Sequence, residues 1–190
     1  MPPRSGWERC PLHIGQRIAV CGPTGSAKTT VARQLGHQLG LPVIELDALF
    51  HQPNWKPTPA GEFRQKVLDA LGKCPDGWVC DGNYGMVRDI VLSRANTVVW
   101  LRLPFRVAYW RLLKRTISRA WTKEPLWGTN YESWRMTFLS RDSILLWGVS
   151  HWRAHFRNLQ RDLAGIPHQA ILIELHSTRE VGDFLEDLEA

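Results

Sequence analysis

The sequence predicts an α/β fold built on a five-stranded parallel sheet, and three observations support this. Short runs of β-branched and apolar residues alternate with segments whose apolar residues recur at helical spacing. A glycine-containing stretch directly follows the first of these runs. A long segment separates the fourth run from the fifth, which predicts an insertion into an otherwise regular α/β order.

The expected strands are short and mostly apolar, as is typical of strands buried on both faces of a parallel sheet. They are RIAVC at 17–21, VIEL at 43–46, WVCDG at 78–82, TVVWLRL at 97–103 and AILIEL at 170–175.

Two helices can be placed between these strands. The first follows the glycine-containing stretch and ends at Gly40, since glycine commonly terminates a helix. The second begins after the pair Thr58-Pro59, a good N-cap and first helical position. Their apolar faces carry Val31, Leu35 and Leu39 in the first helix, and Phe63, Val67 and Leu71 in the second.

The segment between the fourth and fifth strands is too long for a simple crossover. We expect it to contain a helical lid insertion, about residues 116–150, with helices flanking the sheet elsewhere. We expect the 190 residues to form a single domain, 1–190, since this length is that of one ordinary domain.

The composition is that of a soluble globular protein, with 44% hydrophobic and 22% charged residues. No apolar run approaches the roughly 20 residues that span a bilayer, and the first residues lack the apolar core of a secretory signal. The four cysteines show neither a C-x-x-C pair nor zinc-ligand spacing. We therefore expect a cytoplasmic protein with reduced thiols and no membrane partner.

Positive charge is concentrated in the second half of the chain. The net charge is +6, and residues 102–161 contain twelve Lys or Arg against three acidic residues. Seven of the ten tryptophans lie within residues 100–152. A basic, aromatic half predicts an anionic partner, either a small phosphate compound or a polymer.

The stretch GPTGSAKTT at 22–30 has the spacing of a phosphate-binding loop, G-x-x-x-x-G-K-[ST], with Ala27 in place of the second glycine. In such a loop successive backbone N–H groups and a helix N-terminus converge on phosphate oxygens. Lys28 would reach the β- and γ-phosphates, and the Thr29 hydroxyl would bind Mg²⁺. The expected nucleotide-binding residues are Gly22, Pro23, Thr24, Gly25, Ser26, Ala27, Lys28, Thr29 and Thr30.

Ala27 is expected in the first helical turn, at a negative φ, where alanine is the most favourable residue. Glycine is required only at a positive φ or where a β-carbon would collide with a ligand. The sequence therefore predicts that the loop binds phosphate with Ala27 in place.

With this loop, the segments ELDALFHQPNWKP, WVCDGNY and WRLLKRTISRAW make the chain resemble the adenylate-kinase-like P-loop kinases. Within them it looks closest to the bacterial group labelled DNA topology modulation proteins, over residues 16–160. DGNY resembles the Asp-Gly pair that ends strand three in nucleoside monophosphate kinases, and RLLKR resembles their arginine helix leading into the lid. The resemblance implies a five-stranded parallel sheet, Mg·ATP, and phosphoryl transfer to a small acceptor.

Two carboxylates are expected at the carboxyl ends of strands, where ligands gather in open α/β sheets. Asp81 would hold Mg²⁺ directly or through water; the alternative is a cap of the turn at Gly82-Asn83. Asp47 would contact the acceptor and orient or deprotonate its hydroxyl group as a general base; the alternative is again a capping role.

Arginines recur at four-residue spacing at 111, 115 and 119 and at 153, 157 and 161. Like charges at this spacing repel, so an anionic ligand that compensates them is one explanation and two solvated helix faces are the other. The candidates for stabilising the transferred phosphoryl group are Arg115, Arg119, Arg153 and Arg157, with Arg115 matching the pre-lid arginine of the resembled kinases.

Two further residues are candidates for acceptor binding. Arg88 would meet a charge on the acceptor, and Trp55, in a proline-rich loop, would stack on a base or an arginine.

The sequence thus predicts an ATP-dependent kinase that moves the γ-phosphate of Mg·ATP to a small acceptor, such as a nucleotide or nucleoside. The alternative is a nucleic-acid-binding P-loop NTPase or regulator, in which interleaved Arg and Trp grip a single strand. The identity of the acceptor is left open.

Overall fold

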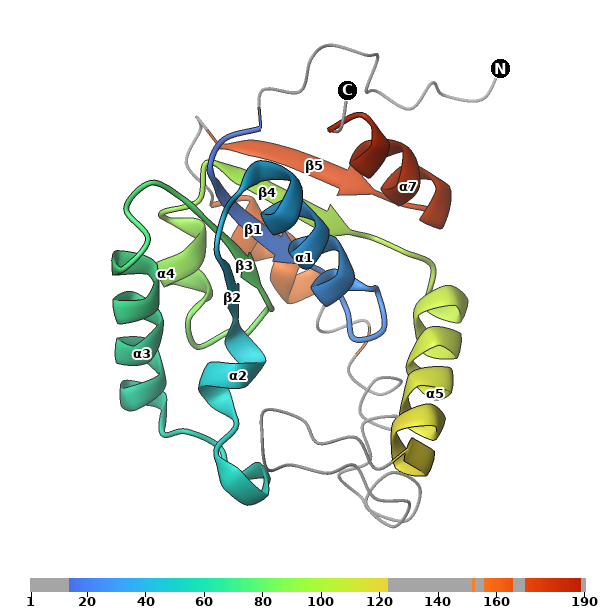
Figure 1. Ribbon diagram of the computed structural model, residues 1–190, viewed down its shortest axis with the longest axis horizontal. Helices are drawn as coiled ribbons and strands as arrows, with labels where there is room; N and C mark the ends of the chain where they lie inside the picture. The colour runs from blue at the N-terminus through green and yellow to red at the C-terminus, as the bar shows by residue number, and fades with distance from the viewer. Residues whose placement is uncertain (1–13, 123–151, 153–155, 166–169, 189–190) are drawn as a thin grey trace.

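The computed structural model describes residues 14–122, 152, 156–165 and 170–188. Five parallel strands form one sheet in the order β2-β3-β1-β4-β5 (Figure 1). The strands are β1 Arg17–Cys21, β2 Val43–Glu45, β3 Trp78–Asp81, β4 Thr97–Leu101 and β5 Ile171–Leu175. The predicted fold class is confirmed.

All but the last of the described helices lie between the strands in chain order, and the last follows β5. They are α1 Lys28–Leu39, α2 Leu46–Phe50, α3 Ala60–Gly72, α4 Arg88–Leu92, α5 Phe105–Thr122 and α7 Thr178–Glu186. A 3₁₀ turn, η1, spans Pro53–Trp55, and residues 156–163 are helical.

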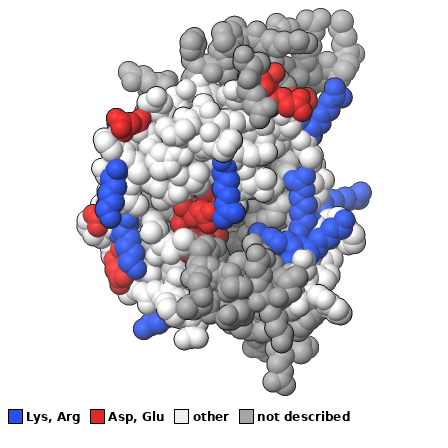
Figure 2. Space-filling view, viewed as in Figure 1, with Lys and Arg blue, Asp and Glu red and all other residues white. Residues whose placement is uncertain are grey.

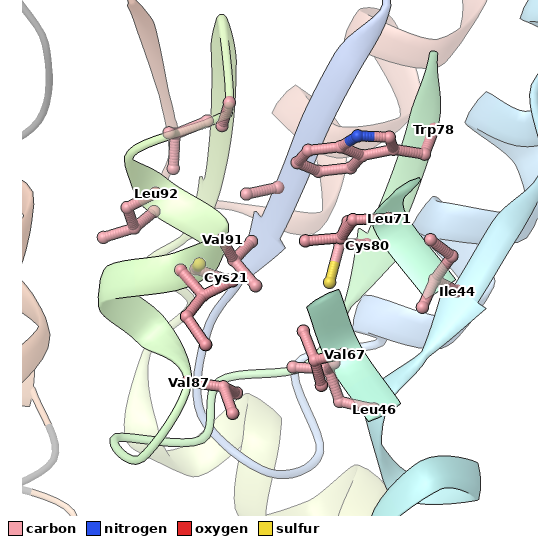
Figure 3. Packing of buried hydrophobic residues seen from close by; sticks show 14 of the residues in the cluster. Cys21, Ile44, Leu46, Val67, Leu71, Trp78, Cys80, Val87, Val91 and Leu92 are labelled. Carbon is pink, nitrogen blue, oxygen red and sulfur yellow. The ribbon is translucent and has the colours of Figure 1, made fainter. Parts of the chain in front are cut away.

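The sheet separates two apolar cores, because successive side chains of a strand point to opposite faces. Ile18 and Val20 of β1 pack under α1 and α7, whereas Ala19 and Cys21 pack on the other face. That second core is formed with α3, α4 and the helical residues 156–163, and Figure 3 shows part of it around Trp78. Both faces of the central strands are therefore covered, as expected for a parallel sheet.

Strand β1 is central and carries the glycine-containing loop at its carboxyl end. Val20 is paired with Asp81 of β3, and Cys21 with Trp100 of β4. This register places Asp81 beside the last residues of β1, at the point where the loop begins.

The end of α1 follows the sequence prediction, whereas the start of α3 lies one residue later than predicted, with Pro59 as the N-cap. Gly40 adopts a left-handed φ of 65° and ends α1, as expected. Strand β2 is one residue shorter than predicted because Leu46 starts α2. The Thr58 hydroxyl does not cap α3; it donates to the Leu49 carbonyl at 3.2 Å and ties α2 to the start of α3.

The predicted lid begins at residue 116, but α5 continues without a break to Thr122. The rest of the predicted lid lies outside the described residues. Within the part of the chain that the structure describes, no helix is both long and apolar enough to cross a membrane. Cys21, Cys74 and Cys80, the cysteines in that part, are free thiols.

Candidate active site

Residues 22–27 connect β1 to α1 and turn through left-handed backbone at three positions. Gly22, Gly25 and Ala27 have φ values of 156°, 82° and 68°. A β-carbon at Gly25 would lie 2.1 Å from the Ala108 carbonyl oxygen, so only glycine fits against α5 there. The loop is therefore held against α5 by a close backbone approach.

The expectation for the backbone of Ala27 was wrong. The residue has φ 68° and ψ 26° and is the N-cap of α1, which begins at Lys28. The left-handed conformation costs an L-residue about 1–2 kcal/mol. The sequence pattern could not show this, because the loop must make one more left-handed turn before the helix can start.

Lys28 folds back over the loop. Its Nζ donates to the Pro23 carbonyl oxygen at 3.0 Å. Burial lowers the pKa of Lys28 and the nearby charge of Arg115 adds to this, while the carboxylates of Asp81 and Asp47 oppose it. The structure thus brings Asp47, Asp81 and Arg115 within electrostatic reach of Lys28.

Asp81 is a buried carboxylate at the end of β3, with 5% of its surface exposed. A hydrogen bond joins its side chain to that of Thr29. Its Oδ1 atom is buried and has no hydrogen-bond partner. Burial raises the pKa of Asp81, and Lys28 and Thr29 act in the opposite direction. A carboxylate oxygen without a partner beside a threonine hydroxyl fits Mg²⁺, which prefers oxygen ligands.

Among the described residues there is no group of three or more His, Cys, Asp or Glu that could hold a metal ion. Mg²⁺ in phosphoryl-transfer sites is usually bound by one or two protein oxygens, substrate phosphates and water. Thr29 and Asp81 supply a set of this kind.

Ser26 is a second buried polar group without a partner. Its side chain is 1% exposed and its Oγ makes no hydrogen bond, while its N–H donates to the Pro23 carbonyl at 3.2 Å. The Oγ atom would lie 2.8 Å from a β-carbon placed on Gly22, so glycine leaves room for it. Orphaned polar groups inside a turning loop fit a ligand rich in oxygen.

Asp47 lies in the first turn of α2 rather than at the end of a strand. The Tyr84 hydroxyl donates to Asp47 Oδ1 at 2.5 Å. Burial and the charge of Asp47 raise the pKa of Tyr84, so the phenol stays protonated and remains the donor. Tyr84 was not predicted as a site residue, although it lies in the DGNY motif, whose resemblance to known kinases concerns only the Asp-Gly pair.

Five ring-bearing side chains pack beside Asp47 and form what we term the aromatic wall: Phe50, His51, Trp55, Phe63 and Tyr84. The Phe50 ring centroid lies 4.7 Å from that of Tyr84 and 5.1 Å from that of Phe63. Trp55, a predicted stacking residue, meets His51 edge-on at 5.2 Å. His51, also missed from sequence, is partly buried, and burial lowers its pKa.

Arg88 is 8% exposed and has partners within the chain. Its Nε donates to Asn83 Oδ1 at 2.8 Å, and its guanidinium forms an ion pair with Asp162. The ion pair links α4 to the helical residues 156–163.

The remaining candidate arginines differ in their surroundings and in how far the structure describes them. Arg115 lies close enough to Lys28 to act on its pKa. Arg157 is exposed in the helical residues 156–163. The side chain of Arg119 and all of Arg153 lie outside the described residues. In the loop itself, Thr24 is half-buried and Thr30 is exposed.

A scan against models of protein families finds no match, and a comparison with curated proteins finds none. Solved structures do match. A shikimate kinase from Acinetobacter baumannii in complex with shikimate has a TM-score of 0.55 and 17% identity, over 92% of this chain and 90% of that one. A shikimate kinase from Bacteroides thetaiotaomicron has a TM-score of 0.53 and 16% identity, over 91% and 96%.

A gluconokinase from Sinorhizobium meliloti 1021 also matches, with a TM-score of 0.51 and 16% identity over 92% of this chain and 90% of that one. Likeness at these identities shows the fold, which is that of P-loop kinases. None of these three structures belongs to the group labelled DNA topology modulation proteins, so that narrower resemblance gains no support.

Proposed function

We propose that this protein is a P-loop phosphotransferase that moves the γ-phosphate of Mg·ATP to a small acceptor. The observation that carries the proposal is the assembly of Lys28, Thr29 and the unpartnered Asp81 oxygen around a left-handed loop. The fold shared with shikimate kinases and a gluconokinase supports the same class of reaction.

The loop would bind the triphosphate through its backbone N–H groups and the N-terminus of α1. Lys28 would exchange the Pro23 carbonyl for β- and γ-phosphate oxygens when the nucleotide binds. Thr29 and Asp81 would hold Mg²⁺, which neutralises charge on the phosphates.

Asp47 would orient and deprotonate the hydroxyl group of the acceptor. Tyr84 occupies one of its carboxylate oxygens and leaves the other for the acceptor. Arg115 would stabilise charge on the transferred phosphoryl group, with Arg119, Arg153 and Arg157 as further candidates for that role.

The test is transfer of labelled γ-phosphate from ATP to a panel of small hydroxyl compounds, with Lys28→Ala and Arg115→Ala as variants. We expect a labelled product whose formation both variants suppress. If Lys28-dependent ATP hydrolysis instead runs at full rate on DNA and no compound is labelled, the protein is the alternative nucleic-acid-dependent NTPase.

Binding of a polymer can be separated from binding of a small molecule by its dependence on salt. Affinity for single-stranded DNA would fall steeply with the logarithm of salt concentration if the basic half grips a phosphate backbone. The kinase proposal predicts that DNA neither binds at physiological salt nor accelerates ATP turnover.

A further inference from the structure

The side of the candidate site formed by α2, η1, α3 and α4, here called the acceptor side, carries matched charges. This inference rests on the proposed function, because it concerns the acceptor of the same reaction. Around this side, Arg64 pairs with Asp89 at 2.8 Å and Lys66 with Glu62 at 2.7 Å.

Two more arginines next to the acceptor side are also paired. Arg33 of α1 contacts Glu45, at the end of β2, at 2.7 Å. Arg88, the buried residue predicted from sequence to meet a charge on the acceptor, is paired with Asp162.

Lys56 is exposed just after η1 and has no acidic partner among the described residues. Lys73 and Arg94 follow the last residues of α3 and α4, so they lie toward the ends at which β3 and β4 begin, away from the loop.

Acidic groups gather where the acceptor hydroxyl would lie. The charges of Asp47 and Glu45 both raise the pKa of Asp81, so the three carboxylates lie within electrostatic reach of one another. Figure 2 shows acidic side chains near the centre of the face in view, with a basic side chain directly beside them and further basic ones on both flanks. An anionic group bound beside Asp47 would be repelled unless a cation faced it.

The aromatic wall offers the other half of the recognition surface. Phe50 and Trp55 are partly exposed, while Phe63 behind them is fully buried. Aromatic faces bind the apolar faces of rings and attract cations. Phenyl, phenol and indole faces supply no positive charge for a carboxylate or phosphate, and burial lowers the pKa of His51, which disfavours its charged form.

We infer that the acceptor is an alcohol that carries no carboxylate or phosphate group, being either neutral or positively charged. The matched arginines, the carboxylates at the ends of β2 and β3, and the aromatic wall together favour such a compound. Because like-charge contacts disfavour a wrong ligand, discrimination against an anionic analogue is expected to be roughly a hundredfold in kcat/KM.

The first test uses matched pairs of candidate acceptors that differ by an anionic group. Glucose is compared with gluconate, a cyclitol with shikimate, and each nucleoside with its monophosphate, all with Mg·ATP. We expect the neutral member of a pair to be phosphorylated with the higher kcat/KM. Preference for gluconate, shikimate or a nucleoside monophosphate would overturn the inference while leaving the kinase proposal intact.

A second test does not depend on finding the acceptor. The protein is saturated with Mg·AMPPNP and titrated calorimetrically with inorganic phosphate and pyrophosphate as probes of a second anion site. We expect no further binding, and one additional site per chain would overturn the inference. Failure of Mg·AMPPNP itself to bind would overturn the proposed function and this inference together.

Matched variants link the result to the ion pairs. Asp89→Asn removes the charge that faces Arg64, and Asp76→Asn removes an exposed charge from the turn before β3. In the presence of Mg·AMPPNP, we expect Asp89→Asn to gain weak phosphate binding that Asp76→Asn lacks. If phosphate binds the wild type and Lys56→Gln abolishes that binding, Lys56 binds the anionic group of an acceptor and the inference is wrong.

Discussion

The two flanks of the candidate site differ in how their charges are balanced. On the flank of α3 and α4, Arg64 and Arg88 each form an ion pair with an acidic residue, Asp89 and Asp162. Helix α5, on the opposite flank, carries five basic residues and no acidic residue: Arg106, Arg111, Lys114, Arg115 and Arg119. Figure 2 shows basic and acidic side chains mixed on the α3 flank, and basic ones alone along the α5 flank.

This difference suggests how the work of the site is divided. A cationic flank suits a triphosphate, whose charge compensates the repulsion between neighbouring arginines. A flank with matched charges suits a compound that brings little charge of its own. In the proposed function, the triphosphate therefore lies on the α5 flank and the acceptor on the flank of α3 and α4.

The largest expected effect concerns Lys28, which lies between the two flanks. Lys28→Met should lower ATP turnover by about 10²–10³-fold, because it removes a positioned cation from the transferred phosphates. Lys56→Met, on the acceptor side, is the control and should leave Mg·ATP binding unchanged. Steady-state ADP release measures ATP turnover in both variants. An equal loss of turnover in Lys28→Met and Lys56→Met would contradict the proposed distinction between the flanks.

The next effect tests the pairing on the acceptor side. Asp162→Ala leaves the Arg88 guanidinium, 9% exposed, without its acidic partner. The free energy of unfolding should fall by about 2–3 kcal/mol, below the full cost of breaking a buried pair because the Asp162 side chain is half-exposed. Asp76→Ala, at an exposed turn, should change it by less than about 0.5 kcal/mol. Urea unfolding of both variants measures the difference, and equal stabilities would show that Arg88 needs no partner.

A smaller effect concerns the hydroxyl group that holds Asp47. Tyr84→Phe keeps the ring contacts of the aromatic wall and removes the 2.5 Å hydrogen bond. We expect kcat to fall about tenfold, the worth of one hydrogen bond to a charged group, while KM for Mg·ATP stays unchanged. A parallel rise in KM for Mg·ATP would mean that Tyr84 supports the whole site rather than positioning Asp47.

The strain at Ala27 predicts a stabilising substitution. Ala27→Gly should raise the free energy of unfolding by about 0.5–1 kcal/mol, because glycine tolerates a φ of 68° but loses more entropy on folding. Ala70→Gly, within α3, should lower it by about 1 kcal/mol. Thermal unfolding measures both changes. Because the two variants carry the same Ala-to-Gly replacement, opposite signs of the change in unfolding free energy would be due to the different backbone conformations at the two positions.

The smallest expected effect is on the pH dependence of the free energy of unfolding. Because burial raises the pKa of Asp81 above its ordinary 3.8, the folded state binds its proton more tightly than the unfolded state does. The stability of the ligand-free protein should therefore fall as the pH rises from about 4 through the titration of Asp81. Asp81→Asn should lack this pH-dependent part of the stability. Identical slopes of unfolding free energy against pH in the wild type and the variant would contradict the burial of a charged Asp81.

Local patterns in the sequence predicted most of the sheet and the loop. The five strands, the helix end at Gly40 and the lysine at the loop all follow from residues near one another in the chain. Helix α2 escaped prediction because it has only five residues, Leu46–Phe50, too few to show a helical period. The backbone of Ala27 escaped prediction because alanine is the best helix former, whereas the loop makes a left-handed turn at this residue before α1 begins.

The pairings that shape the acceptor side could not be predicted. Arg88 and Asp162 lie 74 residues apart, and Asp47 and Tyr84 lie 37 apart. The order of strands in the sheet brings Asp47 and Tyr84 together, and the packing of α4 and residues 156–163 on one face of the sheet brings Arg88 to Asp162. No spacing within the sequence encodes either pair. The register of β1 with β3, which sets Asp81 beside the loop, is of the same kind.

The most direct test of the whole account is calorimetric titration of wild type and Ala27→Gly with Mg·AMPPNP. We expect wild type to bind one equivalent per chain, and Ala27→Gly to bind within about threefold of the same affinity. Absence of binding to wild type, with binding restored in Ala27→Gly, would show that the methyl group blocks the loop and would contradict the account.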